Sequence, residues 1–248
     1  MKQPAFTKSA VLAGSVLLAG LAFSGEPSSK CTITPSSDLG VGFGVGYTNE
    51  YVFRGENRGD DLFEASIGVS GSGSLLGLDD LDLSAGLWLG TYTDPGQSRT
   101  SARSLHEMRI NMEASKSLGS FDLAVGVTNY SYFGNTAQAD NLEPYVALGT
   151  ELAGLSVGIG LYDTEDADDP YWEITVGRSV DLGDLSLSVD GVIGTLNEFD
   201  DTFYGISVGL PIAASDNITV TPHLSAIFGD TTSGDDEFTA GVNLDFGF

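Results

Sequence analysis

The chain ends on the stretch FTAGVNLDFGF, residues 238–248, in which apolar side chains alternate with small or polar ones. One face of an extended strand built from it carries only apolar residues, namely Phe238, Ala240, Val242, Leu244, Phe246 and Phe248. A soluble sandwich would half-bury such a strand, and a membrane barrel would turn its apolar face to lipid. The alternation predicts a strand, and the rest of the chain must decide its surroundings.

Segments of the same kind recur after residue 38, and almost nothing repeats at a helical period. They predict about twelve strands, at residues 39–54, 62–72, 81–92, 103–117, 120–133, 141–152, 155–163, 170–181, 184–196, 202–212, 217–228 and 236–248. Most of them reach the roughly 9–11 residues that a tilted strand needs to cross a bilayer. Their faces separate consistently into apolar and polar, as expected where a charge facing lipid costs about 2–4 kcal/mol.

The connections between these segments alternate in length. Short links at 118–119, 153–154, around 183 and at 213–216 alternate with longer polar links at 55–61, 93–102, 134–140, 164–169, 197–201 and 229–235. This alternation is typical of membrane barrels with short periplasmic turns and longer outer loops. The sequence therefore predicts an all-β fold, a transmembrane antiparallel up-and-down β-barrel, with a soluble secreted β-sandwich as the alternative.

Aromatic residues near the expected strand ends predict interfacial girdles. These residues are Tyr47, Tyr51, Phe53, Phe133, Trp172, Tyr204, Phe228 and Phe248.

Three stretches carry a resemblance to a known family: residues 48–55 (TNEYVFRG), 127–133 (VTNYSYF) and 141–149 (NLEPYVALG). They resemble segments of the TorF-type porin family of proteobacterial outer-membrane β-barrels. The terminal strand is also similar to the last strand of outer-membrane barrels, which the barrel assembly machinery reads. The resemblance implies a Gram-negative source, location in the cell outer membrane, a role in transport, and an assembly signal at Phe246 and Phe248.

The first 24 residues predict a secretory signal peptide, because Lys2 and Lys8 precede a short apolar run and a small-residue site before Gly25. A spanning helix is the alternative to this interpretation. Residues 25–38 form a Ser- and Pro-rich N-terminal leader, and residues 39–248 form the barrel. Cys31, the only cysteine, excludes an intrachain disulfide and is an inert thiol or, alternatively, a lipid attachment site.

The chain is strongly acidic, with 35 acidic and 10 basic residues and a formal net charge of −25. This charge excludes nucleic acid as a partner, because phosphates require basic patches. It serves either solubility in a salty medium or the attraction of cations. The expected partners are outer-membrane lipids and lipopolysaccharide, the barrel assembly machinery, and small solutes or cations; the oligomeric state stays open.

If the apolar faces contact lipid, the opposite faces define a lumen. Its outer part carries seven charged residues on the polar register, namely Glu50, Arg54, Glu64, Glu107, Arg109, Glu143 and Glu173. In one reading the two arginines bridge the carboxylates and help to plug a narrow barrel. In the other, the excess carboxylates line a water-filled constriction that favours cations. The sequence leaves both readings open.

No catalytic, metal or cofactor site is predicted. Ser104 and His106 share the outward register, as in barrels that hydrolyse lipids, but no G-x-S-x-G elbow or orienting third group accompanies them. Acidic residues in the outer loops could bind Ca²⁺ or Mg²⁺ without forming a dedicated site.

The sequence thus predicts an outer-membrane porin that forms a narrow diffusion channel for small solutes or cations. The alternative is a non-conducting structural or surface-interaction barrel with acidic, cation-binding outer loops.

Overall fold

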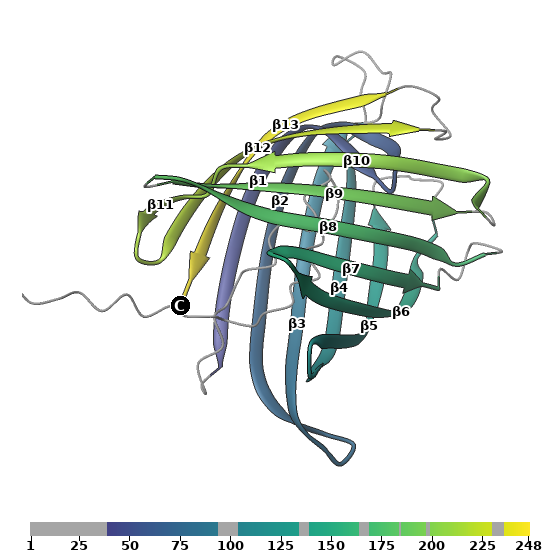
Figure 1. Ribbon diagram of the computed structural model, residues 1–248. Helices are drawn as coiled ribbons and strands as arrows, with labels where there is room; N and C mark the ends of the chain where they lie inside the picture. Colours follow the sequence, from purple (N-terminus) through teal and green to yellow (C-terminus); the bar gives the residue numbers. More distant parts are fainter. Residues whose placement is uncertain are drawn as a thin grey trace, which may run out of the picture.

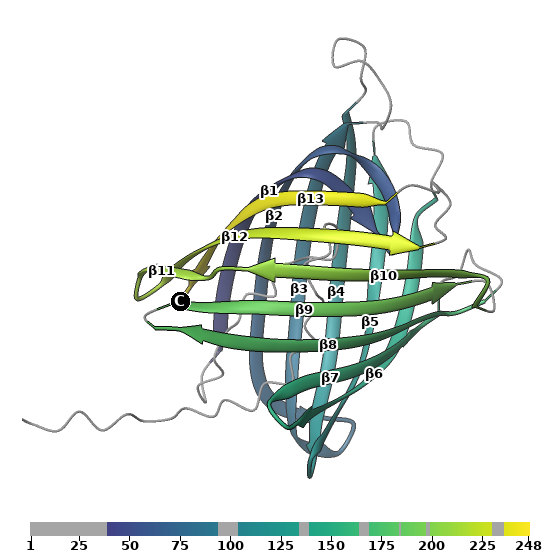
Figure 2. The same ribbon diagram turned by 45° about the horizontal axis from the view of Figure 1, so that its top comes forward.

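The computed structural model describes residues 39–93, 104–133, 139–163, 169–183, 185–196, 199–229 and 236–248, which form a closed antiparallel β-barrel (Figures 1 and 2). The expected signal peptide and leader, residues 1–38, lie outside the described residues, as do most of the acidic outer loops. No helix among the described residues is long and apolar enough to cross a membrane.

The strands follow the expected segments closely. They are β1 (Gly40–Phe53), β2 (Glu56–Leu75), β3 (Leu78–Thr93), β4 (Ser104–Leu118), β5 (Phe121–Phe133), β6 (Asn141–Leu152), β7 (Leu155–Tyr162), β8 (Tyr171–Leu182), β9 (Leu185–Leu196), β10 (Asp201–Gly209), β11 (Ile212–Ser215), β12 (Ile218–Gly229) and β13 (Glu237–Gly247). Strands β10 and β11 both pair with β12 and share one place in the wall, so the barrel has 12 strands. The predicted all-β barrel is confirmed.

One expected strand, 202–212, is interrupted at Leu210 and Pro211. A proline has no N–H to donate to the ladder, so regular pairing stops at this position. The N–H of Leu210 still donates to the carbonyl of Pro222, 3.0 Å away, and holds the break against β12.

The barrel closes where the last strand meets the first. Their antiparallel register runs from Gly42 opposite Gly247 to Thr48 opposite Gly241. The rings of Phe43 and Phe246 lie 5.8 Å apart on the outer face of this seam. The sheet therefore has no open edge over the length of this pairing.

Side chains alternate between the outer face and the lumen along each strand. On β12, Leu224 is 63% exposed, whereas its neighbours His223 and Ser225 are 7% and 6% exposed. Apolar residues on the outside and buried polar residues on the inside are the arrangement of a barrel that faces lipid.

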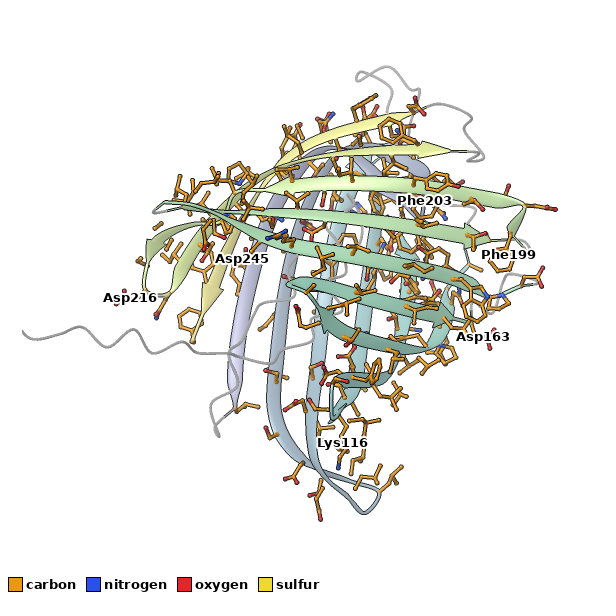
Figure 3. The ribbon with its side chains drawn as sticks, in the orientation of Figure 1. Lys116, Asp163, Phe199, Phe203, Asp216 and Asp245 are labelled. Atoms are coloured by element: carbon orange, nitrogen blue, oxygen red, sulfur yellow. The ribbon has the colours of Figure 1, made fainter. Side chains whose placement is uncertain are left out.

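The two ends of the barrel differ in their connections. On one end, here called the turn side, tight turns such as Leu76–Gly77 and Ala153–Gly154 have both residues at positive φ, as type I′ hairpins require. On the other end, the loop side, most connections are longer. Figure 3 labels Lys116 and Asp216 on the turn side, and Asp163 and Phe199 on the loop side.

The first connection on the loop side is an exception. A long polar link was expected at residues 55–61, but β2 begins at Glu56 and the chain reverses at Arg54–Gly55, with φ angles of 52° and 79°. The expectation was wrong because an Arg-Gly pair makes the same two-residue turn as the X-Gly pairs of the other end.

The tip of this hairpin, residues 51–60, leaves the barrel wall. The β1–β2 register shifts between Tyr51 and Val52, and the β2–β3 register shifts between Asp60 and Phe63. Bulges of this kind bend a strand and redirect its side chains. Above Thr48 the tip arches across the loop-side mouth, as Figures 1 and 2 show for β1 and β2.

Because of this bend, the aromatic girdle differs from the expected one. Phe133, Trp172, Tyr204, Phe228 and Phe248 are exposed as expected, at 38–78%. Tyr51 and Phe53 are not: they are 0% and 8% exposed, because the hairpin tip folds over the lumen and both of its faces are buried, with Val52 between them also 0% exposed.

Candidate functional site: the loop-side lumen

Large and small inward side chains occupy different halves of the lumen. Among the described residues, the inward aromatic side chains lie in the loop-side half: Trp88, Tyr92, Tyr130, Tyr132, Tyr145, Tyr162, Tyr171 and Phe203. The turn-side half presents mainly small residues, including Gly44, Gly68, Ser84, Gly86, Ser115, Ala124, Gly158, Ser188 and Ser207. The loop-side half is therefore the part of the barrel that side chains fill.

The hairpin tip packs against the opposite wall through an apolar contact. Val52, which is 0% exposed, lies among Tyr171, Val192, Phe203 and Ile227. These residues come from β8, β9, β10 and β12. The tip is thus docked by burial of apolar surface.

A second aromatic cluster fixes the base of the tip. Tyr51 and Phe53 pack with Trp88, Tyr92 and Tyr130, whose strands form the near wall. The rings of Tyr51 and Tyr92 are 4.8 Å apart in an edge-to-face arrangement, which adds to the burial of their surfaces.

Arg54 joins the tip to the far wall. Its two terminal nitrogens donate to the two oxygens of Glu143, each at 2.7 Å, and the side chains are 8% and 2% exposed. The guanidinium also lies 4.1 Å from the Tyr171 ring centroid and 5.1 Å from that of Tyr162. A planar, bidentate and stacked contact of this kind suits arginine far better than lysine.

Arg109 forms the second ion pair. Its Nε donates to Glu107 Oε1 at 2.6 Å, and the side chains are 2% and 3% exposed. A terminal nitrogen donates to the Tyr51 hydroxyl, which in turn donates to Glu107 Oε2. The guanidinium also lies 4.6 Å from the centroid of Trp88.

The other predicted carboxylates also contact groups from neighbouring strands. Glu64 accepts a hydrogen bond from Trp88 Nε1 at 2.6 Å, and Glu173 accepts one each from Tyr162 and Tyr171. Glu50 pairs in register with Asp60 and lies beside Glu237. The predicted residues therefore line the loop-side lumen, and Arg54 and Arg109 each bridge one of its glutamates.

Sequence reasoning missed the aromatic residues of the lumen. Several of these rings occupy the space beside a glycine where a side chain would begin. A Cβ at Gly90 would overlap Trp88, and one at Gly194 would overlap Phe203. The sequence carries a partial signal for these inward rings. In Trp88-Leu-Gly90 and Gly160-Leu-Tyr162, an aromatic residue lies two positions from a glycine, on the same face of the strand. Glycine lets the ring lie along the wall.

A Gly194→Ala substitution is expected to destabilise the barrel by about 1–3 kcal/mol, because the added methyl overlaps Phe203, which is buried and cannot move aside. Gly191→Ala on the same strand is the control, because a Cβ there meets only carbonyl oxygens at 3.7 and 3.9 Å. Urea unfolding in detergent micelles measures both. Equal stability of the two variants would contradict the packing described here.

The outward pair Ser104 and His106 lies exposed on β4. His106 Nδ1 is 3.0 Å from Thr91 Oγ1 on β3, and within the described chain no hydrogen bond joins Ser104 to His106. A serine nucleophile needs a base within hydrogen-bond reach. No group of three or more His, Cys, Asp or Glu among the described residues could hold a metal ion.

No family model and no curated protein matches the sequence. The fold is similar to the outer membrane phospholipase A from Escherichia coli, with a TM-score of 0.51, 14% identity, and coverage of 83% of this chain and 92% of that one. It is also similar to the NanC porin, with a TM-score of 0.51, 12% identity, and coverage of 83% and 98%. At these identities the likeness concerns the fold alone. The protein is a 12-strand β-barrel of the outer-membrane type.

Proposed function

We propose that the protein is an outer-membrane porin, a narrow diffusion channel for small solutes with a preference for cations. In this proposal the structure describes its closed state, in which the hairpin tip covers the loop-side mouth.

The observation that carries the proposal is the division of the lumen. The wall's own inward side chains are small in the turn-side half, and much of the packing in the loop-side half comes from one hairpin. A barrel built only as a structural element would gain stability from large side chains along its whole length. A path lined by glycine and serine and covered at one mouth by a single hairpin favours passage instead.

The preference for cations follows from the inward charges. In the described part of the chain, Asp122, Glu151, Asp190 and Asp245 face the turn-side lumen, whereas Arg178 at this level is exposed on the outer register of β8. Carboxylates along a water-filled path lower the energy of cations and repel anions.

The test is current through the purified, folded protein in a planar bilayer under a KCl gradient. The double variant Asp190→Asn/Asp245→Asn is expected to lower the cation-to-anion permeability ratio by about a factor of two to five, because two lumen charges are lost. Asp80→Asn/Asp216→Asn removes two exposed charges at the tips of turn-side hairpins and is the matched control. Absence of conductance in folded protein would refute the proposal.

The second candidate function is a non-conducting barrel that acts through its acidic outer loops. The close packing of Val52 and Arg54 in the lumen favours it. Silent bilayers together with cation- or lipopolysaccharide-dependent stability would support it over the channel.

Membership in the TorF-type family, residence in the cell outer membrane, and assembly through Phe246 and Phe248 form part of the same proposal. Phe248 is 78% exposed at the seam, where its N–H donates to the Val41 carbonyl at 3.0 Å. We propose transport rather than catalysis, because Ser104 and His106 are not hydrogen-bonded to each other.

A further inference from the structure

The contacts of the Arg54 side chain are those of a guanidinium ligand in a binding site. Glu143 receives it through two parallel hydrogen bonds of 2.7 Å, and the Tyr171 and Tyr162 rings lie against the guanidinium at 4.1 and 5.1 Å. A carboxylate fork in the plane of the ion and aromatic faces beside it recognise a guanidinium specifically. A small spherical cation would use only the carboxylate.

The wall groups on the Arg54 side of the lumen, here called the Arg54 socket, are Tyr130, Glu143, Tyr162, Tyr171 and Glu173, and all belong to strands β5–β8. The hairpin adds only the ring of its own Phe53, 4.8 Å from the guanidinium. They orient one another: Tyr130 donates to Glu143 at 3.1 Å, and Tyr162 and Tyr171 donate to Glu173 at 2.6 and 3.0 Å. The socket is therefore preorganised without its occupant, which is the condition for tight binding of a small ligand.

The occupant, by contrast, lies on the hairpin tip, outside the paired barrel wall. The hairpin tip is joined to the wall through bulges at Tyr51/Val52 and at Asp60/Phe63, and it turns over only two residues. If Arg54 moved away, Glu143 would lose the guanidinium that donates to both of its oxygens. Removing the counter-charge of a buried carboxylate is costly, so the vacated socket favours another positive charge.

We propose that the Arg54 socket is a binding site for guanidinium-bearing small molecules, and that Arg54 is an internal substitute for this ligand in the closed state. A soluble guanidinium compound competes with Arg54 for the same groups. Because it binds only the state in which the tip is displaced, it shifts the population toward that state. The link to transport rests on the proposed channel function, but the binding site itself does not.

The first test uses Arg54→Ala protein and ethylguanidinium as the probe. Ethylguanidinium is expected to raise the Tm of the variant toward the wild-type value, with an affinity about tenfold or more above that of N-ethylurea, which has a similar shape but no charge. The double variant Arg54→Ala/Glu143→Gln is expected to lose this response. Equal responses to the two compounds, or an undiminished response in the double variant, would overturn the proposal.

The second test uses the wild-type protein, so it does not depend on whether a variant folds. Phe53 is buried in the wild-type protein, so chymotrypsin should cut after it faster when ethylguanidinium, but not N-ethylurea, displaces the tip. An unchanged rate at saturating ethylguanidinium would overturn the proposal.

Bilayer recordings then separate the site from the channel. A higher open probability with ethylguanidinium is expected if both proposals hold. Faster cleavage with silent bilayers would support the binding site and count against the porin function.

Discussion

Replacing residues 51–59 with Asn-Gly is expected to raise single-channel conductance by about an order of magnitude, because the hairpin that closes the loop-side mouth is removed. Glu50 and Asp60 face each other in the regular register, one pair below Tyr51 and Gly59 and the bulge, and a two-residue type I′ turn can join them. The deletion takes Tyr51, Val52 and Arg54 out of the lumen. Single-channel recording in planar bilayers measures the effect.

The control for this deletion is a truncation of similar size outside the lumen. Replacing residues 74–80 with Asn-Gly shortens the β2–β3 hairpin, which projects beyond the turn side, and joins Gly73 to its partner Leu81. Its conductance is expected to equal that of the wild type. If the first deletion folds and also conducts as the wild type does, the hairpin is not the closing element.

A Glu143→Gln substitution is expected to destabilise the closed barrel by about 3–5 kcal/mol, because it breaks the buried, bidentate ion pair with Arg54. The loss cannot exceed the free energy of docking the tip, since beyond that point the tip undocks while the wall stays folded. Urea unfolding followed by tryptophan fluorescence measures the stability. Undocking should also appear as a higher open probability in bilayers.

The matched control is Glu151→Gln, on the same strand but exposed near the turn side, where it accepts a hydrogen bond from Ser156. Its stability is expected to stay within about 0.5 kcal/mol of the wild type. Adding Arg54→Gln to Glu143→Gln should recover part of the loss, and the cycle gives the coupling energy of the pair. If the Glu143 and Glu151 variants proved equally stable, the ion pair would not hold the tip.

Much of the wall could be predicted from the sequence, because a barrel imposes a period of two on each strand and the cost of charge in lipid enforces it. The faces of β12 and β13 illustrate this, with Leu224 and Val242 outside and His223 and Asn243 inside. The same period placed Glu64, Glu107 and Glu143 in the lumen. It failed at Tyr51 and Phe53, because the hairpin tip folds over the lumen and buries both of its faces.

Which residues belong to the site could be predicted from the sequence, but which of them contact one another could not. Arg54 and Glu143 were both expected near the outer end, but their pairing joins residues 89 positions apart and depends on a hairpin that crosses the lumen. Alternation along a strand carries no information about such a crossing. The Arg-Gly turn at residues 54–55 was the one local signal, and it marks a reversal without giving its direction.

During folding, the hairpin tip can dock only after the barrel wall has closed. Val52 rests among side chains of β8, β9, β10 and β12, which surround one point only after the sheet has curled and β13 has met β1. Contacts this distant in sequence form late, because the intervening chain must first be ordered. Each newly closed barrel therefore passes through an interval in which its wall is complete and its mouth is uncovered. For the channel proposed above, the rate of docking sets how long solutes can pass before the mouth is covered.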